Sequence, residues 1–187
     1  MLKSEARKIF AQKRKTITPQ QRNRWNDLVL IQFQNISLPP VHTLFTYAAT
    51  DTEVSTDAIV DYLHFQNPGM QIAYPFSDFE TSSMQAIKVT AETLFIINKY
   101  KIPEPETGTI IFPEDIDVVI MPMLCFDKEG YRVGYGKGFY DKYLEQVRED
   151  VIKVGLCYYE PIDKIDDRNK FDVPLDYCVT PERTYEF

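Results

Sequence analysis

The sequence predicts an α/β fold, in which helices pack on a central, mostly parallel β-sheet. A strand expected over residues 41–47 is followed by a helix over 57–65 and a short strand over 71–74. Such a strand, helix, strand succession is typical of parallel pairing. In addition, Asp117-Val-Val-Ile-Met121 is too apolar to alternate, which is typical of a strand buried on both faces. In sheets of this kind ligands gather at the loops that follow the strands' carboxyl ends.

Helical patterns frame the expected sheet. Residues 3–14 place apolar side chains at helical spacing opposite a basic face, and on spacing alone that face is expected to meet solvent. The run Thr18-Pro-Gln-Gln21 has a capping residue, a proline at the first helical position and a glutamine at the third. These features predict a second helix whose buried stripe ends at Phe33. A fourth helix is expected to begin straight after Gly138 and to run to about Arg148.

The other parts of the chain give weaker signals. Pro75 is expected to end the strand that begins at Gln71. The remaining expected elements are an edge strand over 84–89, a strand or helix over 93–97, an extended turn at 102–105, and strands over 151–159 and 177–180.

Composition and charge limit the function classes. The 187 residues are 44% hydrophobic and 26% charged, which favours one soluble globular domain. With a net charge of −7 the chain has no general field for nucleic acid or an anionic membrane, so any anion site must be local. The chain shows no signal-peptide core and no apolar run of membrane-span length. We therefore expect a cytoplasmic protein without nucleic-acid or membrane partners.

The positions of the cysteines and histidines also limit the cellular compartment and the type of mechanism. Cys125, Cys157 and Cys178 lie in apolar runs without metal-site spacing, which is typical of buried thiols in a reducing compartment. The two histidines, His42 and His64, lie far along the chain from any glycine cluster. A mechanism centred on histidine is therefore disfavoured.

One stretch concentrates the functional signals: Gly130-Tyr-Arg-Val-Gly-Tyr-Gly-Lys-Gly-Phe-Tyr-Asp141 holds four of the seven glycines. Glycines at alternate positions can turn several amides toward one spot, and Lys137, Arg132 and a helix start add positive charge. This pattern predicts a phosphate cradle. The spacing matches neither a Walker A loop nor the dinucleotide fingerprint, and a glycine-rich hairpin or helix cap with a solvated lysine is the alternative.

Carboxylates near this stretch suggest further roles. Asp141 at the end of a phosphate loop implies a divalent cation, with Asp172 or Asp176 as the second ligand, because Mg²⁺ prefers one or two carboxylates plus phosphate oxygens and water. Glu53 lies in the loop after the first strand. It is equally compatible with substrate contact and with a stabilising position near a helix start.

The segment from Met121 to Leu144, which contains the glycine stretch, closely resembles the signature of the 5-formyltetrahydrofolate cyclo-ligase family, also called methenyltetrahydrofolate synthetases. The likeness extends along nearly the whole chain. It implies a single domain over residues 1–187 with a Rossmann-like, three-layer α/β/α arrangement, acting as a monomer on small-molecule substrates. Many relatives carry two tyrosines before the loop's aspartate, whereas the first of the two positions here is Phe139, so this chain lacks that phenol.

The resemblance also implies roles for individual residues. ATP contacts are implied for Lys3, Arg7, Arg132, Val133, Gly134, Tyr135, Gly136, Lys137, Gly138, Phe139 and Tyr140. Folate contacts are implied for Tyr47, Glu53, Met84, Tyr135, Gly136, Lys137, Gly138 and Phe139. Magnesium ligation is implied for Asp141 and Asp176, and direct catalytic roles for Lys137, Arg132 and Tyr140.

The activity that the resemblance implies is the ATP- and Mg²⁺-dependent conversion of 5-formyltetrahydrofolate to 5,10-methenyltetrahydrofolate, with release of ADP and phosphate. Phosphorylation of the N5-formyl oxygen would precede attack by N10. Phosphoryl transfer needs mainly alignment and charge neutralisation, which suits a chain poor in histidine. Two alternatives stay open: a different small-molecule kinase or ligase, and a catalytically silent protein that binds folate or senses nucleotide.

Overall fold

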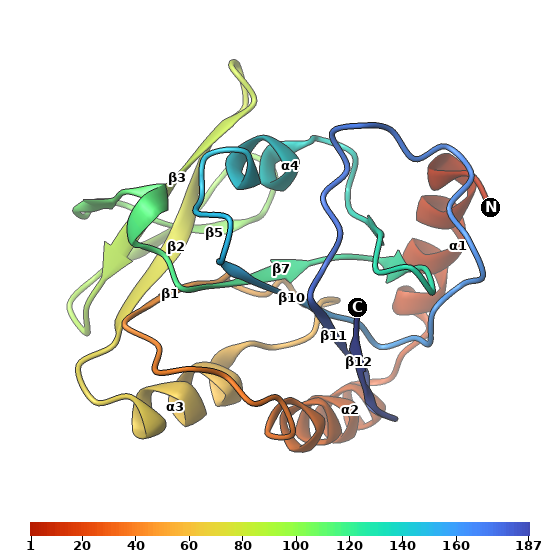
Figure 1. Cartoon of the computed structure of the whole chain (residues 1–187), viewed down its shortest axis with the longest axis horizontal. Helices are drawn as coiled ribbons and strands as arrows, with labels where there is room; N and C mark the ends of the chain where they lie inside the picture. Colours follow the sequence, from red (N-terminus) through yellow and green to blue (C-terminus); the bar gives the residue numbers. More distant parts are fainter.

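The computed structural model describes residues 1–187 as a mixed α/β fold (Figure 1). The helices are α1 (Lys3–Lys15), α2 (Pro19–Phe33), α3 (Asp57–Gln66), the short 3-10 helix η1 (Pro113–Asp115) and α4 (Phe139–Leu144). The strands are β1 (Thr43–Phe45), β2 (Gln71–Asp78), β3 (Ser83–Val89), β4 (Phe95–Ile97), β5 (Pro103–Pro105), β6 (Ile110–Ile111), β7 (Val118–Pro122), β8 (Cys125–Phe126), β9 (Arg132–Val133), β10 (Ile152–Leu156), β11 (Tyr177–Val179) and β12 (Thr184–Glu186).

The central sheet has eight strands in the order β12-β11-β10-β7-β1-β2-β3-β6. Its five middle strands, from β11 to β2, are all parallel, and antiparallel strands close both edges. The apolar run in β7 lies at the middle of the sheet, where Val118, Val119, Ile120 and Met121 are completely buried. The predicted α/β class with a mostly parallel sheet is confirmed.

The connections place a topological switch point between β1 and β7. From β1 the chain passes through α3 to β2 on one side, and it later returns to add β7 on the other side of β1. The loops that follow these two strands therefore leave the sheet's carboxyl edge in opposite directions and open a crevice between them.

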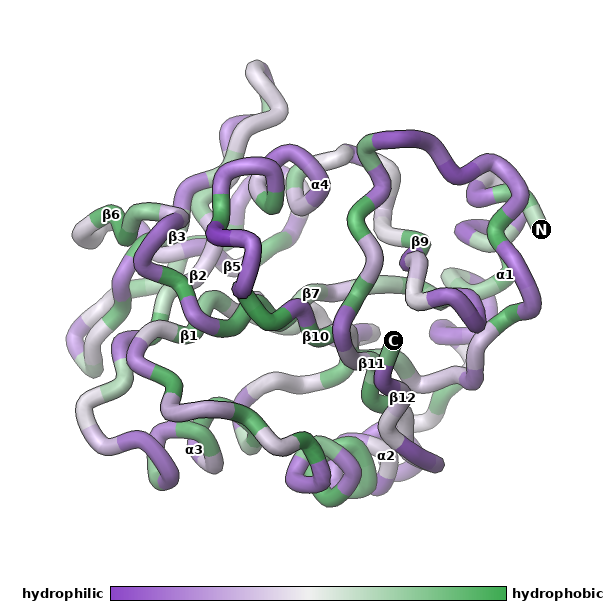
Figure 2. Tube along the Cα trace, viewed as in Figure 1, coloured by the Kyte–Doolittle hydropathy of each residue, from purple (hydrophilic) through white to green (hydrophobic).

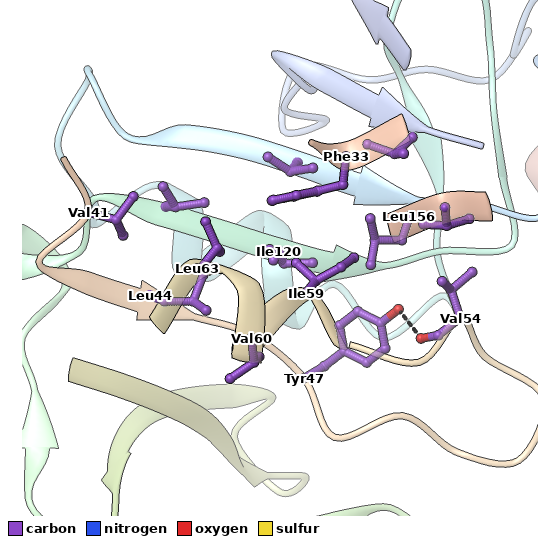
Figure 3. Packing of buried hydrophobic residues seen from close by; sticks show 14 of the residues in the cluster. Phe33, Val41, Leu44, Tyr47, Val54, Ile59, Val60, Leu63, Ile120 and Leu156 are labelled. Carbon is purple, nitrogen blue, oxygen red and sulfur yellow. Dashed lines mark hydrogen bonds between the residues drawn. The ribbon is translucent and has the colours of Figure 1, made fainter. Parts of the chain in front are cut away.

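Two apolar clusters cover the two faces of the sheet. On one face α2 and α3 supply Phe33, Ile59 and Leu63, which pack against Leu44 and Ile120 (Figure 3). The other face is covered by α4 and by extended segments, with Tyr143, Leu144 and Phe126 among the buried side chains. One outer layer is thus helical, whereas the other combines one short helix with loops. In Figure 2 hydrophobic residues concentrate inside, and the loop over residues 163–172 is mostly hydrophilic.

Helix α1 packs at the end of the sheet rather than on either face (Figure 1). Its buried Ala6 and Phe10 contact Leu124, Cys125 and Val133 of the β8–β9 hairpin. The amino-terminal half of α1 is thereby fixed beside the glycine stretch. No helix of the structure has both the length and the apolar composition of a membrane span.

Several predicted boundaries are wrong. Strand β2 continues through Pro75 to Asp78, because its pairing with β1 ends at Ala73 and the missing amide of Pro75 then faces an open edge. The expected turn at 102–105 is strand β5, which pairs with β4 in a separate two-stranded sheet. Helix α4 ends at Leu144 and not near Arg148.

Candidate active site

A cavity of about 510 Å³ opens at the carboxyl edge of the sheet, at the switch point between β1 and β7. Its volume falls in the range of small-molecule sites. It brings together most of the predicted site residues, namely Lys3, Arg7, Tyr47, Glu53, Met84, Arg132, Gly134, Tyr135, Gly136, Lys137, Gly138, Phe139, Tyr140 and Asp141. Asp172 lines it as well.

The glycine stretch has two separate parts. Gly130 belongs to the β8–β9 hairpin, where its amide donates to the carbonyl of Asp127. The loop in the cavity covers Gly134 to Gly138, with left-handed φ angles of 86° at Gly136 and 72° at Gly138. These two positions require glycine for their backbone conformation, whereas Gly134 does not.

Two cations of the cavity have no carboxylate partner. The Arg7 Nε donates to the carbonyl of Gly134 at 3.0 Å, and its guanidinium forms no ion pair. Lys137 is exposed and forms neither a hydrogen bond nor an ion pair; its Nζ lies 5.7 Å from the centre of the Tyr100 ring. Both cations therefore remain available to an anion at the glycine loop.

Two further cations are held by carboxylates. The Arg132 Nη2 donates to Asp141 Oδ1 at 2.6 Å, and its Nη1 donates to the carbonyl of Val173 at 2.7 Å. Burial lowers the pKa of Arg132 and the Asp141 charge opposes this, but the guanidinium stays protonated. The Lys3 Nζ lies 2.6 and 2.5 Å from the two carboxylate oxygens of Asp172. Asp141 and Asp172 are thus the carboxylates beside the cradle.

Glu53 is built into the opposite wall and is only 7% exposed. Its Oε2 accepts from the amide and the hydroxyl of Thr50, both at 2.8 Å, and its Oε1 accepts from the Tyr135 hydroxyl at 2.6 Å. Its carbonyl accepts from the Tyr158 hydroxyl. The Tyr47 hydroxyl donates to the carbonyl of Val54 (Figure 3), so this phenol stabilises the loop and only the rest of the side chain is left for a ligand.

Aromatic side chains line the mouth and the floor of the cavity. The Phe139 ring packs edge-on against Phe79, which packs against Tyr100 with ring centres 4.0 Å apart. The Tyr140 hydroxyl is buried without a hydrogen-bond partner. Desolvation, with a further contribution from the Glu53 charge, raises the pKa of Tyr140, so this phenol stays protonated and can donate.

Two predicted site residues lie elsewhere. Asp176 precedes β11 at the amino end of the parallel strands, where its carboxylate binds the amide and the Nζ of Lys153, so it does not join Asp141 in the cavity. The side chain of Val133 is fully buried under α1, because neighbouring strand residues point to opposite faces and Arg132 takes the cavity side. Its carbonyl accepts from Leu124. Neither residue lines the cavity.

Sequence reasoning also missed residues at or behind the cavity. Phe79 and Tyr100 line it from segments that carried no clear signal. Arg14 is buried behind it and donates to the Tyr135 hydroxyl at 2.8 Å. One sequence signal was present for Arg14: it lies two helical turns after Arg7, and therefore on the same face of α1.

Comparison with known proteins decides the family. The sequence model of the 5-formyltetrahydrofolate cyclo-ligase family matches residues 1–181, almost the entire chain. This chain belongs to the 5-formyltetrahydrofolate cyclo-ligase family.

Individual cyclo-ligases agree with this membership. The 5-formyltetrahydrofolate cyclo-ligase of Escherichia coli K12 is 26% identical over 187 residues, covering 96% of this chain and 100% of that protein. The Mycoplasma pneumoniae cyclo-ligase is 28% identical, covering 97% of this chain and 100% of its own length. The NMR structure of Aquifex aeolicus 5,10-methenyltetrahydrofolate synthetase matches with a TM-score of 0.79 and 27% identity, over 100% of this chain and 93% of that one. The chain therefore aligns over the whole length of both curated relatives, in keeping with a cyclo-ligase family enzyme.

The cavity offers few carboxylate ligands, so a magnesium ion would fit it only if substrate phosphates and water supply the other ligands. No three His, Cys, Asp or Glu side chains converge anywhere in the chain. Asp141 has a free Oδ2, and Asp172 faces the same cavity. Mg²⁺ commonly binds through one or two carboxylates, with substrate phosphates and water completing its shell, so two carboxylates beside a phosphate cradle are compatible with this ion.

Proposed function

We propose that this chain catalyses the ATP-dependent closure of 5-formyltetrahydrofolate to 5,10-methenyltetrahydrofolate, with ADP and phosphate released. Family membership and the names of the relatives support the substrate and the product. The structural observation that carries the proposal is the cavity itself. It brings together Lys137 of the glycine loop and Arg7 of α1, two cations without carboxylate partners, and an anchored carboxylate, Glu53.

The reaction consists of two transfers. The N5-formyl oxygen attacks the γ-phosphorus, the bond to the β-phosphate oxygen breaks, and ADP leaves. N10 then attacks the formyl carbon and loses its proton, and the carbon–oxygen bond breaks with release of phosphate. Because the formyl oxygen leaves as phosphate, no protein nucleophile is required.

The cradle residues align the phosphates and neutralise their charge. Amides of the loop from Gly134 to Gly138 and the Lys137 ammonium contact the phosphates, and Arg7 reaches them from α1. Arg132 supplies a further positive charge, held in place by Asp141 and by the Val173 carbonyl. Oriented charges of this kind, in a partly enclosed cavity, contribute more than they would in water.

Magnesium would be held by Asp141 and Asp172. When bound, the ion neutralises phosphate charge during transfer. Lys3 holds Asp172 at the cavity wall. Asp176 takes no part, since its carboxylate binds Lys153 at the other end of the strand.

The folate lies on the side of Glu53. This carboxylate accepts hydrogen bonds from donors of the pterin ring, while Met84, Tyr47 and Phe139 contact the ring through apolar atoms. The buried hydroxyl of Tyr140 has no hydrogen-bond partner in the protein, so its proposed partner is an acceptor atom of the substrate. The absence of a phenol at Phe139 leaves ring stacking intact.

A direct assay tests the proposal. Purified protein, 5-formyltetrahydrofolate and Mg-ATP are mixed, and the near-ultraviolet absorbance of the methenyl product is followed, with mixtures lacking ATP or magnesium as controls. Growth of that absorbance only in the complete mixture is expected. If both ligands bind but no absorbance develops, the protein is a folate-binding or nucleotide-sensing member of the family instead. If ATP is consumed only with another acid, a different ligase activity replaces the proposal.

Monomeric state and cytoplasmic location stay predictions. Light scattering on the purified protein, with and without substrates, tests the first of them.

A further inference from the structure

Arg14 is a buried cation that the mechanism above does not use. It is 4% exposed, lies in the last turn of α1 and does not line the cavity. Its Nη2 donates to the carbonyl of Met123 and its Nη1 donates to the Tyr135 hydroxyl, while its Nε is buried without a partner. No carboxylate contacts it directly. Burying a charge is costly unless it is compensated, so an indirect partner is expected.

That partner is Glu53, reached through one phenol. The Tyr135 hydroxyl accepts from Arg14 at 2.8 Å and donates to Glu53 Oε1 at 2.6 Å. Because a guanidinium can only donate, the Tyr135 proton must point to Glu53. The hydrogen-bonded chain from Arg14 to Glu53 therefore has a single direction, with a positive charge at one end and a negative charge at the other.

We propose that Arg14 is a positioning residue, which acts through Tyr135 to hold the Glu53 carboxylate in the orientation that folate binding needs. This inference rests on the proposed function, because Glu53 is taken there as the folate ligand. Thr50 fixes Oε2 of Glu53, and the Arg14–Tyr135 pair fixes Oε1, so each carboxylate oxygen has its own anchor. Without Arg14, the Tyr135 hydroxyl is free to rotate and one anchor is lost.

The same helix face also holds the neighbouring loop residue. Arg7 donates to the carbonyl of Gly134, and Arg14, two turns later, donates to the side chain of Tyr135. Helix α1 thus holds two successive residues of the glycine loop, one on the phosphate side and one on the folate side. An effect that passes through Arg14 should therefore fall on folate and spare ATP.

Three variants test this separation: Arg14→Met, Tyr135→Phe and the double variant. We expect Arg14→Met and Tyr135→Phe each to raise the KM for 5-formyltetrahydrofolate about ten-fold, the scale of one charge-assisted hydrogen bond. The KM for ATP should change by less than about two-fold, which corresponds to less than about 0.5 kcal/mol in binding free energy. The double variant should be no worse than the more severe single variant, because both remove the same chain of contacts.

Controls separate positioning from folding. Arg14→Lys retains a cation that can reach Tyr135 and should recover part of the lost folate affinity. Arg148→Met is the control for loss of a hydrogen-bonded arginine outside the cavity, because Arg148 donates to Asp150, Asp117 and the carbonyl of Glu114 and does not line the cavity. Each variant's thermal unfolding is recorded, and titration calorimetry measures binding of 5-formyltetrahydrofolate and of Mg-ADP separately.

The outcomes distinguish the two proposals. If the unaltered protein binds folate without forming the methenyl product, the proposed function fails, and the calorimetric folate affinities still test Arg14. Loss of folate affinity with Mg-ADP affinity retained, together with non-additivity, supports the positioning role. Equal loss of both ligands, independent effects of the two substitutions, or unchanged folate affinity in a folded Arg14→Met variant would overturn it.

Discussion

Arg132 Nη2 lies 2.6 Å from Asp141 Oδ1, so a cation assigned to the phosphates and a carboxylate assigned to magnesium lie directly against each other. The Arg132 side chain is almost fully buried, and it needs this anion because an uncompensated buried charge is costly. Asp141 still has a free Oδ2. One carboxylate can thus hold the arginine with one oxygen and offer the other oxygen to a metal ion.

The first prediction concerns this shared carboxylate. Asp141→Asn keeps an oxygen that accepts from Arg132 but removes the charge that attracts magnesium. We expect the magnesium concentration for half-maximal activity to rise about ten-fold or more. A magnesium titration at saturating ATP and folate measures it. Asp163→Asn is the control, since Asp163 pairs with Lys128 outside the cavity. Superimposable titrations for Asp141→Asn and the unaltered protein would refute the metal role.

The second prediction concerns Lys137, the cation of the cradle without any polar partner. Lys137→Ala removes one charge-assisted contact with phosphate, about 1.5–3 kcal/mol. The kcat/KM for ATP should therefore fall roughly ten- to a hundred-fold. Lys128→Ala, which removes an exposed lysine outside the cavity, is the matched control. Steady-state kinetics equal to those of the control would show that Lys137 is only a solvated loop residue.

Much of the fold was predictable because its signals are local. The apolar run of β7 and the Thr18 cap, whose hydroxyl oxygen accepts from the Gln21 amide, form their elements as expected. The extension of β2 past Pro75 was not predictable, because it depends on β1 ending its pairing at Ala73. Boundaries set by a neighbouring strand leave no trace in the strand's own sequence.

The candidate site also has a part that was predictable from the sequence and a part that was not. The pattern of glycines and charges was enough to place Lys137 and Asp141 together, whereas it left the role of Glu53 open, and the family resemblance was needed to assign Glu53 to the same cavity. The residues alone left Asp172 and Asp176 open and the resemblance implied Asp176, because the path of the loop before β11, which decides which carboxylate faces Lys3 and which faces Lys153, is not readable from the sequence.

The third prediction uses three glycines of the loop as a graded series. The Cβ added by Gly134→Ala would have no atom within 4 Å, and the φ of Gly134 is not left-handed. The free energy of unfolding should therefore stay the same or rise slightly. Gly138→Ala should lower it by about 1–2 kcal/mol because of its φ of 72°. Gly136→Ala should lower it further, because its Cβ would lie 3.0 Å from the Arg7 Cζ. Urea unfolding measures the order, and equal values for all three would contradict the loop geometry.

The last prediction concerns pH and Asp117, at the sheet edge opposite the cavity. Desolvation would raise the pKa of Asp117, but the amides of Thr43 and His42 and the Arg148 guanidinium outweigh it and lower the pKa below its ordinary 3.8. A lowered folded-state pKa stabilises the protein above about pH 4, and this stabilisation is lost as pH falls through the folded value. Asp117→Asn should therefore lower the urea midpoint at pH 7, and the difference should shrink steadily below pH 4. Asp150→Asn removes the other carboxylate of Arg148 without touching the two amides, so it is the matched control. A midpoint difference for Asp117→Asn that stays constant between pH 7 and pH 3 would contradict the lowered pKa.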